Sequence, residues 1–158
     1  MYTQVSGDRY EGGFVNGIMH GFGRYTFKGS ATPDVSRSVY LEGTWVEGRL
    51  PSGVVVYTDG ARFEGALHWN DNVRGVRKAG ALRLGGKVAG NTYEGSFNEK
   101  GLFHGNGRYT FAEQNGGGHY VGPFAEGKFH GKGREVFQSG SYYSCLLYTS
   151  DAADDGLS

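Results

Sequence analysis

Residues 93–111 read YEGSFNEKGLFHGNGRYTF, and two other stretches of the chain follow the same frame. Residues 10–29 read YEGGFVNGIMHGFGRYTFKG, and residues 120–140 read YVGPFAEGKFHGKGREVFQSG. Each stretch carries Tyr-x-Gly-x-Phe, a glycine turn, His-Gly-x-Gly-Arg, and then a Phe three residues after the Arg. Agreement at so many positions indicates an array built from one structural repeat.

Two weaker copies of the frame fill the middle of the chain. Residues 41–60 read LEGTWVEGRLPSGVVVYTDG, with Trp45 at the Phe position, and residues 63–67 (FEGAL) open a copy that loses the frame over 68–90. Repeats are therefore expected to start near residues 10, 41, 63, 93 and 120, and a truncated one near 143. Residues 1–144 are interpreted as one repeat array, with loop insertions at 30–39 and 112–119.

Glycine and aromatic residues fall on one face of the expected strands. Side chains alternate along a strand, so Tyr10, Gly12 and Phe14 share a face. The glycines after the turn are expected on that face too, each covered by a ring from a neighbouring strand. A lone hairpin is marginal in water, so stability must come from stacked neighbours. The sequence predicts an all-β fold, an elongated, twisted, single-layer antiparallel sheet of stacked hairpins. The residues that carry this prediction are Tyr10, Gly12, Phe14, Gly21, Gly23, Tyr93, Gly95, Phe97, Gly105, Gly107, Tyr120, Gly122, Phe124, Gly131 and Gly133.

Composition excludes several classes of protein. The 158 residues include 30 Gly, 11 Tyr and 10 Phe, and aromatics at fixed positions favour strands over a disordered linker. The formal net charge of zero argues against a nucleic-acid partner. No apolar run is long enough for a transmembrane helix, and the first residues lack the pattern of a signal peptide. We therefore expect a cytoplasmic location, at a membrane or the cytoskeleton.

The repeat resembles the MORN family (membrane occupation and recognition nexus). The resemblance rests on Tyr-x-Gly-x-Phe followed by His-Gly-x-Gly at 10–23, 93–107 and 120–133. It implies an elongated β-sheet that acts in scaffolding, dimerisation or membrane association. MORN arrays occur alone, in cytoskeletal and flagellar proteins, or beside catalytic domains such as lipid kinases and a protein lysine methyltransferase. The family supplies no catalytic residue.

The last residues depart from the repeat. Residues 145–155 read CLLYTSDAADD, and Cys145 stands where the repeat expects a glycine. The string resembles a translated sequencing adapter, so 145–158 is interpreted as a non-native tail and set aside from the fold.

One run of basic residues has no acid between Asp71 and Glu94. Such clusters bind anionic lipid, and a solvated loop between repeats is the competing interpretation. The candidate contacts for an anionic phospholipid or a protein partner are Arg74, Arg77, Lys78, Arg83 and Lys87.

Two other side-chain types recur with the frame. Arg24, Arg108 and Arg134 could line a surface for phosphate or carboxylate groups, or could pair across strands with Glu11, Glu94 or Glu126. The aligned histidines lack the further ligands that a metal site needs, so they are expected to be structural and no metal or cofactor is expected: His20, His104 and His130.

The sequence favours a non-catalytic scaffold or adaptor, because no catalytic constellation accompanies the repeats. Expected partners are other proteins, an anionic phospholipid, and a second copy in a homodimer, since an open sheet edge can pair with another chain. The alternative is an N-terminal regulatory or targeting module of a larger lipid kinase or protein lysine methyltransferase. A glycan-binding role is less favoured, because it predicts exposed Trp pairs and only Trp45 and Trp69 are present.

Overall fold

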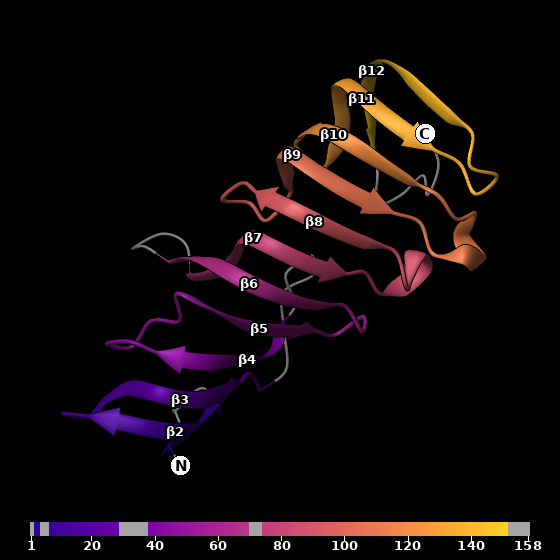
Figure 1. Ribbon diagram of the computed structural model, residues 1–158. Coiled ribbons are helices and arrows are strands. Elements are labelled where there is room, and N and C mark those ends of the chain that lie inside the picture. The colour runs from indigo at the N-terminus through magenta and orange to yellow at the C-terminus, as the bar shows by residue number, and fades with distance from the viewer. Residues whose placement is uncertain (1, 4–6, 29–37, 70–73, 152–158) are drawn as a thin grey trace.

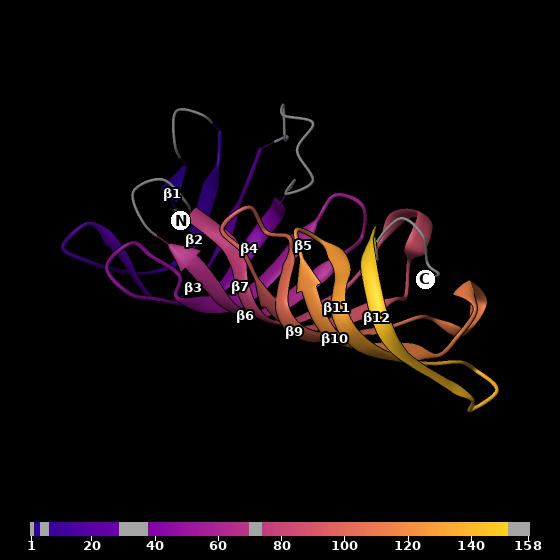
Figure 2. The ribbon, with the colours of Figure 1, turned by 90° about the horizontal axis from the view of Figure 1, so that it is seen from above.

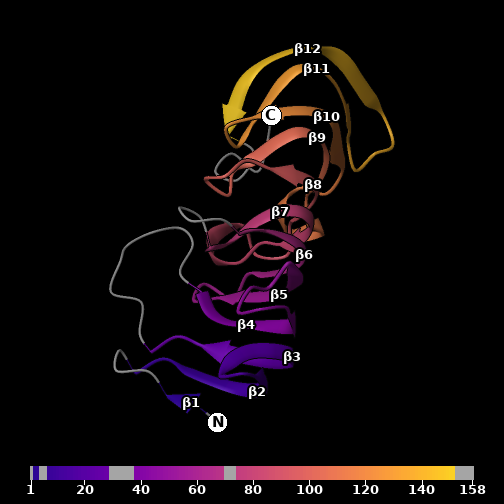
Figure 3. The same cartoon turned by 90° about the vertical axis from the view of Figure 1, so that its left-hand side faces the viewer.

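The computed structural model describes residues 2–3, 7–28, 38–69 and 74–151, and it confirms an all-β, single-layer antiparallel sheet. Twelve strands lie side by side in chain order, so each strand pairs with its sequence neighbours (Figure 1). The sheet twists along its length, and β1 and β12 lie at its opposite ends (Figures 2 and 3). The strands are β1 Tyr2–Thr3, β2 Arg9–Val15, β3 Ile18–Thr26, β4 Ser38–Trp45, β5 Ser52–Tyr57, β6 Arg62–Trp69, β7 Arg74–Arg83, β8 Thr92–Phe97, β9 Phe103–Thr110, β10 His119–Ala125, β11 Lys128–Val136 and β12 Tyr142–Asp151. Two single-turn 3-10 helices, η1 Gly86–Val88 and η2 Glu113–Asn115, lie in connections between strands.

A row of glycines crosses the sheet. Each of the ten strands β2 to β11 contributes one glycine, which stands next to the glycine of the neighbouring strand in the row. Gly80 keeps β7 in this row although the sequence frame is lost there. The row consists of Gly12, Gly23, Gly43, Gly53, Gly65, Gly80, Gly95, Gly107, Gly122 and Gly133, and Cys145 is the next register partner.

Aromatic rings occupy the space above most of this row, and Leu50 lies over Gly43 and Gly53. A Cβ placed on Gly107 would lie 2.6 Å from the hydroxyl oxygen of Tyr93, and a Cβ on Gly133 would meet the ring of Tyr120. The rings are fixed at their far end, because the Tyr93 hydroxyl donates to the Ser96 carbonyl at 2.7 Å. The hydroxyls of Tyr10 and Tyr120 make the same bond to the residue three positions on.

The glycine of each His-Gly pair was expected to lie under a ring, and its structural role is a different one. Gly21, Gly105 and Gly131 have φ of 84°, 79° and 66°, and they have no aromatic ring against them. Their left-handed backbone coincides with register shifts between neighbouring strands, which are β-bulges. These three glycines are therefore needed for the bulge, and the rings cover the glycines two residues further on.

The hydrophobic core lies on the aromatic face of the sheet. Ring contacts between successive repeats bury its side chains. Tyr93 stacks on Phe103 with centroids 4.1 Å apart, and both contact Phe124 of the next repeat. Trp45 in the second repeat contacts the rings of Tyr10 and Trp69 on either side. Each such pair contributes about 0.5–1.5 kcal/mol beyond area burial.

The tail set aside in the sequence analysis contributes to a strand. β12 runs from Tyr142 to Asp151 and pairs antiparallel with β11, so seven residues of the tail lie in the sheet. Pairing of this kind uses backbone groups, which any sequence offers at the open edge of β11. Where these residues come from stays a prediction.

Candidate functional site

The basic run lies in strand β7 and helix η1, and its members lie in different surroundings. Arg77 is half-buried on the aromatic face, with its guanidinium 5.0 Å from the ring centroid of Phe97 and 5.2 Å from that of Tyr57. It also donates to the Gly101 carbonyl at 2.7 Å. Arg77 therefore joins consecutive repeats through cation–π contacts and a hydrogen bond.

The other basic residues of the run do not gather around Arg77. Arg83 is exposed on the opposite face, because its strand neighbour Leu82 is buried on the aromatic face. Lys78 is exposed beside the bulge of β7, and Lys87 is exposed in η1. Arg74 begins β7 at the other end of the strand from Arg83. The described side chains of the run therefore form no single surface, and its role in lipid contact remains a prediction.

The face opposite the rings, here called the outer face, carries charged residues in register. Arg24 pairs with Glu42 at 2.8 Å and also lies over the ring of Tyr40, so its ion-pair partner is not the expected Glu11. Arg108 stands directly opposite Glu94. Glu126, the partner expected for Arg134, lies 3.6 Å from Lys100 instead.

Two arginines on the outer face oppose each other directly. Arg62 and Arg83 are register partners on β6 and β7, and both side chains are exposed. Like charges in this position are destabilising on a sheet. Arg62 has Glu64 at 3.3 Å, an exposed pair of the kind that contributes little. Bound anions would relieve the remaining repulsion.

A second group of cations surrounds His119 on the outer face of β9–β11. Arg108 Nη2 lies 3.3 Å from His119 Nε2. Burial, followed by the charges of Arg108 and Arg134, lowers the pKa of His119 below its usual 6.5. Folding therefore disfavours the protonated imidazole of His119. The contribution of His119 to the stability of the fold is full above pH 6.5, and it is lost as the pH falls through the folded-state pKa.

Replacing Arg108 tests this electrostatic environment. In Arg108→Gln the pKa of His119, followed by NMR through the imidazole carbon-bound protons, should rise toward the usual value because one neighbouring positive charge is gone. The matched control, Arg24→Gln, removes an arginine from distant β3 and should leave that pKa unchanged. An unchanged His119 pKa in Arg108→Gln would show that the arginine is too well screened to matter.

The aligned histidines occupy no common site. The backbone N–H of Glu47 donates to His20 Nδ1 at 3.3 Å, and His104 and His130 are exposed. Among the described residues, no group of three or more His, Cys, Asp or Glu side chains is placed to hold a metal ion. Within that part of the chain, no helix is long and apolar enough to cross a membrane.

Four exposed apolar side chains on β2, β3 and the turn after β4 were not anticipated from the sequence. Val15, Ile18, Phe22 and Val46 are 52%, 50%, 67% and 47% exposed. All four lie on the outer face, since each neighbours a residue of the aromatic face along its strand or turn. We call these four residues the tip patch. The sequence feature that could have predicted this patch is Phe22, because the other full repeats have the polar residues Asn106 and Lys132 at that position.

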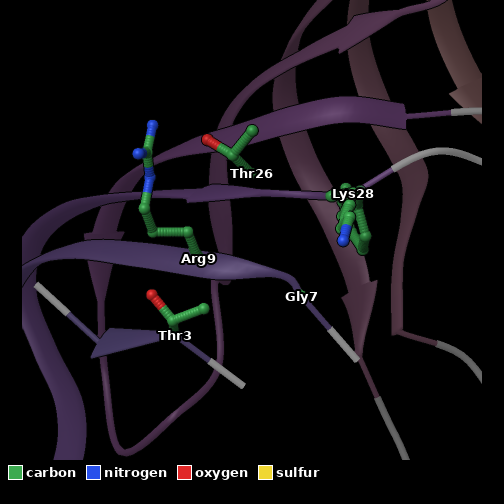
Figure 4. A pocket seen from close by; sticks show the side chains of 6 residues that line it. Thr3, Gly7, Arg9, Thr26 and Lys28 are labelled. Carbon is green, nitrogen blue, oxygen red and sulfur yellow. The ribbon is translucent and has the colours of Figure 1, made fainter. Parts of the chain in front are cut away.

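A shallow hollow lies near the N-terminal end of the sheet. Its lining includes Thr3, Arg9, Thr26 and Lys28. In Figure 4 the side chains of Arg9 and Lys28 do not converge, so the two cations form no joint binding site.

Comparison with known proteins assigns the repeats. The family model for the MORN repeat matches residues 10–31, 93–116 and 120–142, which cover all but the first residue of the hairpins β2–β3, β8–β9 and β10–β11. No curated protein matches the chain. The matched hairpins share the glycine row, the covering tyrosines and the bulge glycines with one another, and the intervening strands continue the same row. The chain therefore contains three MORN repeats.

Proposed function

We propose that this chain is a non-catalytic scaffold module that binds other proteins through the tip patch. The observation that carries the proposal is the exposure of Phe22, the most exposed large apolar side chain among the described residues. Three further exposed apolar residues lie on the same face, on β2, on β3 and in the turn after β4. Aromatic residues in an apolar surface patch are typical anchors of protein interfaces. MORN repeats occur in membrane-associated and scaffold-like proteins, which supports the same class of function.

The structure also provides the rigidity that such a surface needs. The turn residues Glu47 and Gly48 pack on the preceding hairpin: the Gly48 N–H donates to the Met19 carbonyl at 2.8 Å, and a Cβ at Gly48 would lie 3.2 Å from Ile18. Val46 is held by two backbone hydrogen bonds to Arg49. A partner would therefore meet preordered apolar groups and would lose little affinity to ordering them.

Substitution of the tip patch tests the proposal. The double variant Phe22→Ser and Val46→Ser should lower the recovery of cellular binding proteins by about tenfold, because two anchors are lost. The control is Val121→Ser, which removes a 44% exposed apolar side chain from the outer face of distant β10. Equal recovery by the wild type and the double variant, quantified by mass spectrometry, would refute the tip patch as the binding surface.

A second candidate function is contact with an anionic membrane surface, favoured by the direct opposition of Arg62 and Arg83. If it holds, vesicles containing phosphatidylserine or a phosphoinositide should retain the wild type at low salt. The double variant Arg62→Gln and Arg83→Gln should then bind less, and the tip-patch variant should bind equally. Either role also suits a targeting module beside a catalytic domain, and we place the module in the cytoplasm.

A further inference from the structure

The residues next to the glycine row form a charged row on the outer face, and its acids follow the repeat frame. The second residue of each of the first four repeats is a glutamate, as in YEG, LEG, FEG and YEG. Where an arginine stands beside these glutamates, the charges match: Arg24 lies in register between Glu11 and Glu42 and pairs with Glu42 at 2.8 Å. The four glutamates are Glu11, Glu42, Glu64 and Glu94.

The fifth repeat departs from this rule. Residues 120–124 read YVGPF, so Val121 takes the place of the glutamate. Val121 is the register partner of Arg108 on β9 and of Arg134 on β11, and its side chain is 44% exposed. Two exposed arginines therefore stand on either side of the position where the frame would put a carboxylate.

The surrounding outer face is cationic. The strands β9, β10 and β11 lie side by side (Figure 1). β9 holds one Lys or Arg residue, β10 none and β11 three, and the one acid of these strands is Glu135. Glu135 is buried and stands opposite Tyr120, so it belongs to the aromatic face. The outer face of these three strands therefore carries positive charge without a carboxylate of its own.

Both arginines act on the space around Val121. Arg108 extends toward β10, since its Nη2 lies 3.3 Å from His119 Nε2. His119 lies two residues from Val121 on the same strand and therefore on the same face. After burial, the charges of Arg108 and Arg134 are the causes that lower the pKa of His119. The positive potential of the two side chains therefore extends over β10.

We propose that the outer face of β9–β11 binds an acidic segment of a partner protein, with one Glu or Asp carboxylate of that segment seated over Val121 between Arg108 and Arg134. Neighbouring strands lie about 4.8 Å apart, so the two arginines start about 10 Å apart and their long side chains can meet one carboxylate between them. Such binding needs only the positive charge of each guanidinium, which hydrogen bonds to neutral groups leave in place. The site is separate from the tip patch, so it stands or falls independently of the proposed function.

The charges on the neighbouring strands favour a short acidic segment over a flat membrane. Glu94 is exposed on β8, and Glu64 is exposed on β6 in the same row. An anionic membrane laid on this face would approach these carboxylates, and like charges repel. A segment that lies over β9–β11 alone would avoid them.

Fluorescence anisotropy of the full chain at low salt tests the site, with a labelled peptide of alternating Glu and Ser residues as the probe. The wild type should bind this peptide and should not bind the same peptide with Gln in place of Glu. Val121→Glu should lower the affinity about tenfold, because it places the chain's own carboxylate between the arginines. Val121→Gln is the matched control: it has the same size and no charge, and it should bind like the wild type.

Folding is not in doubt for Val121→Glu, since four other repeats carry glutamate at this position, and its melting temperature should equal or exceed that of the wild type. The double variant Arg62→Gln and Arg83→Gln, on β6 and β7, should bind the peptide like the wild type. A wild type that does not bind the peptide, or equal binding by Val121→Glu and Val121→Gln, would overturn the inference. It would also be overturned if phosphatidylserine vesicles or a single-stranded oligonucleotide, and not the peptide, bound the wild type and lost Val121→Glu.

Discussion

Gly107→Ala should destabilise the protein by about 2 kcal/mol or more, although it adds a single methyl group. The new Cβ would lie 2.6 to 2.8 Å from three atoms of the Tyr93 side chain. That ring cannot move easily, because it is fully buried, stacks on Phe103 and donates to Ser96. Chemical denaturation followed by far-ultraviolet circular dichroism measures the change.

Gly60→Asn is the matched control for this prediction. Gly60 lies in a turn with φ of 91°, and a Cβ there would meet nothing within 4 Å. Asn tolerates left-handed backbone, so the cost should stay below about 1 kcal/mol. Similar costs at both positions would mean that glycine is needed for chain conformation throughout, and not for space under the rings.

Trp45→Ala should cost about 3–5 kcal/mol, the range for truncating a large buried aromatic side chain. Trp45 is 1% exposed and contacts rings of the first and third repeats, and its indole N–H donates to the Gly23 carbonyl at 3.0 Å. In a linear array stability is a sum over neighbouring repeats, so the loss should be local. Hydrogen exchange should accelerate in β2–β6 and stay slow in β8–β11.

Two results would speak against that account of Trp45. The first is uniform acceleration across all strands, which would indicate one cooperative unit instead of coupled neighbours. The second is an equal loss in Phe22→Ser, because Phe22 is 67% exposed and should contribute little to folding.

The repeat frame predicts the sheet well because the decisive features are local in sequence. Tyr-x-Gly-x-Phe places its ring and its glycine two residues apart, which is the period of a strand. The frame does not reveal how far the row extends, because the β6–β7 hairpin carries extra residues and register shifts before Gly80 regains the row. A bulge of this kind shifts the alternation that sequence reasoning depends on.

The candidate sites were harder to predict, for the same physical reason. Arg77 and Arg83 belong to one basic run, yet the strand places them on opposite faces and Arg77 packs on Tyr57 and Phe97. Gly21 falls in the expected alternation with Gly23, but its φ of 84° places it in a bulge. The tip patch combines residues of the first hairpin with Val46, which the pairing of β3 with β4 brings to the same face, and a single repeat's residues do not encode that pairing.

The most direct test of the central claim, that glycines are needed because tyrosine rings occupy the space above them, is a double-mutant cycle. Tyr93→Leu removes the ring atoms that would meet a Cβ at Gly107. Leucine is chosen because Leu82, the register partner of Tyr93 on β7, is already a leucine. In that background Gly107→Ala should cost less than about 0.5 kcal/mol, against about 2 kcal/mol or more with Tyr93 present. An equal cost of Gly107→Ala in both backgrounds would contradict the account.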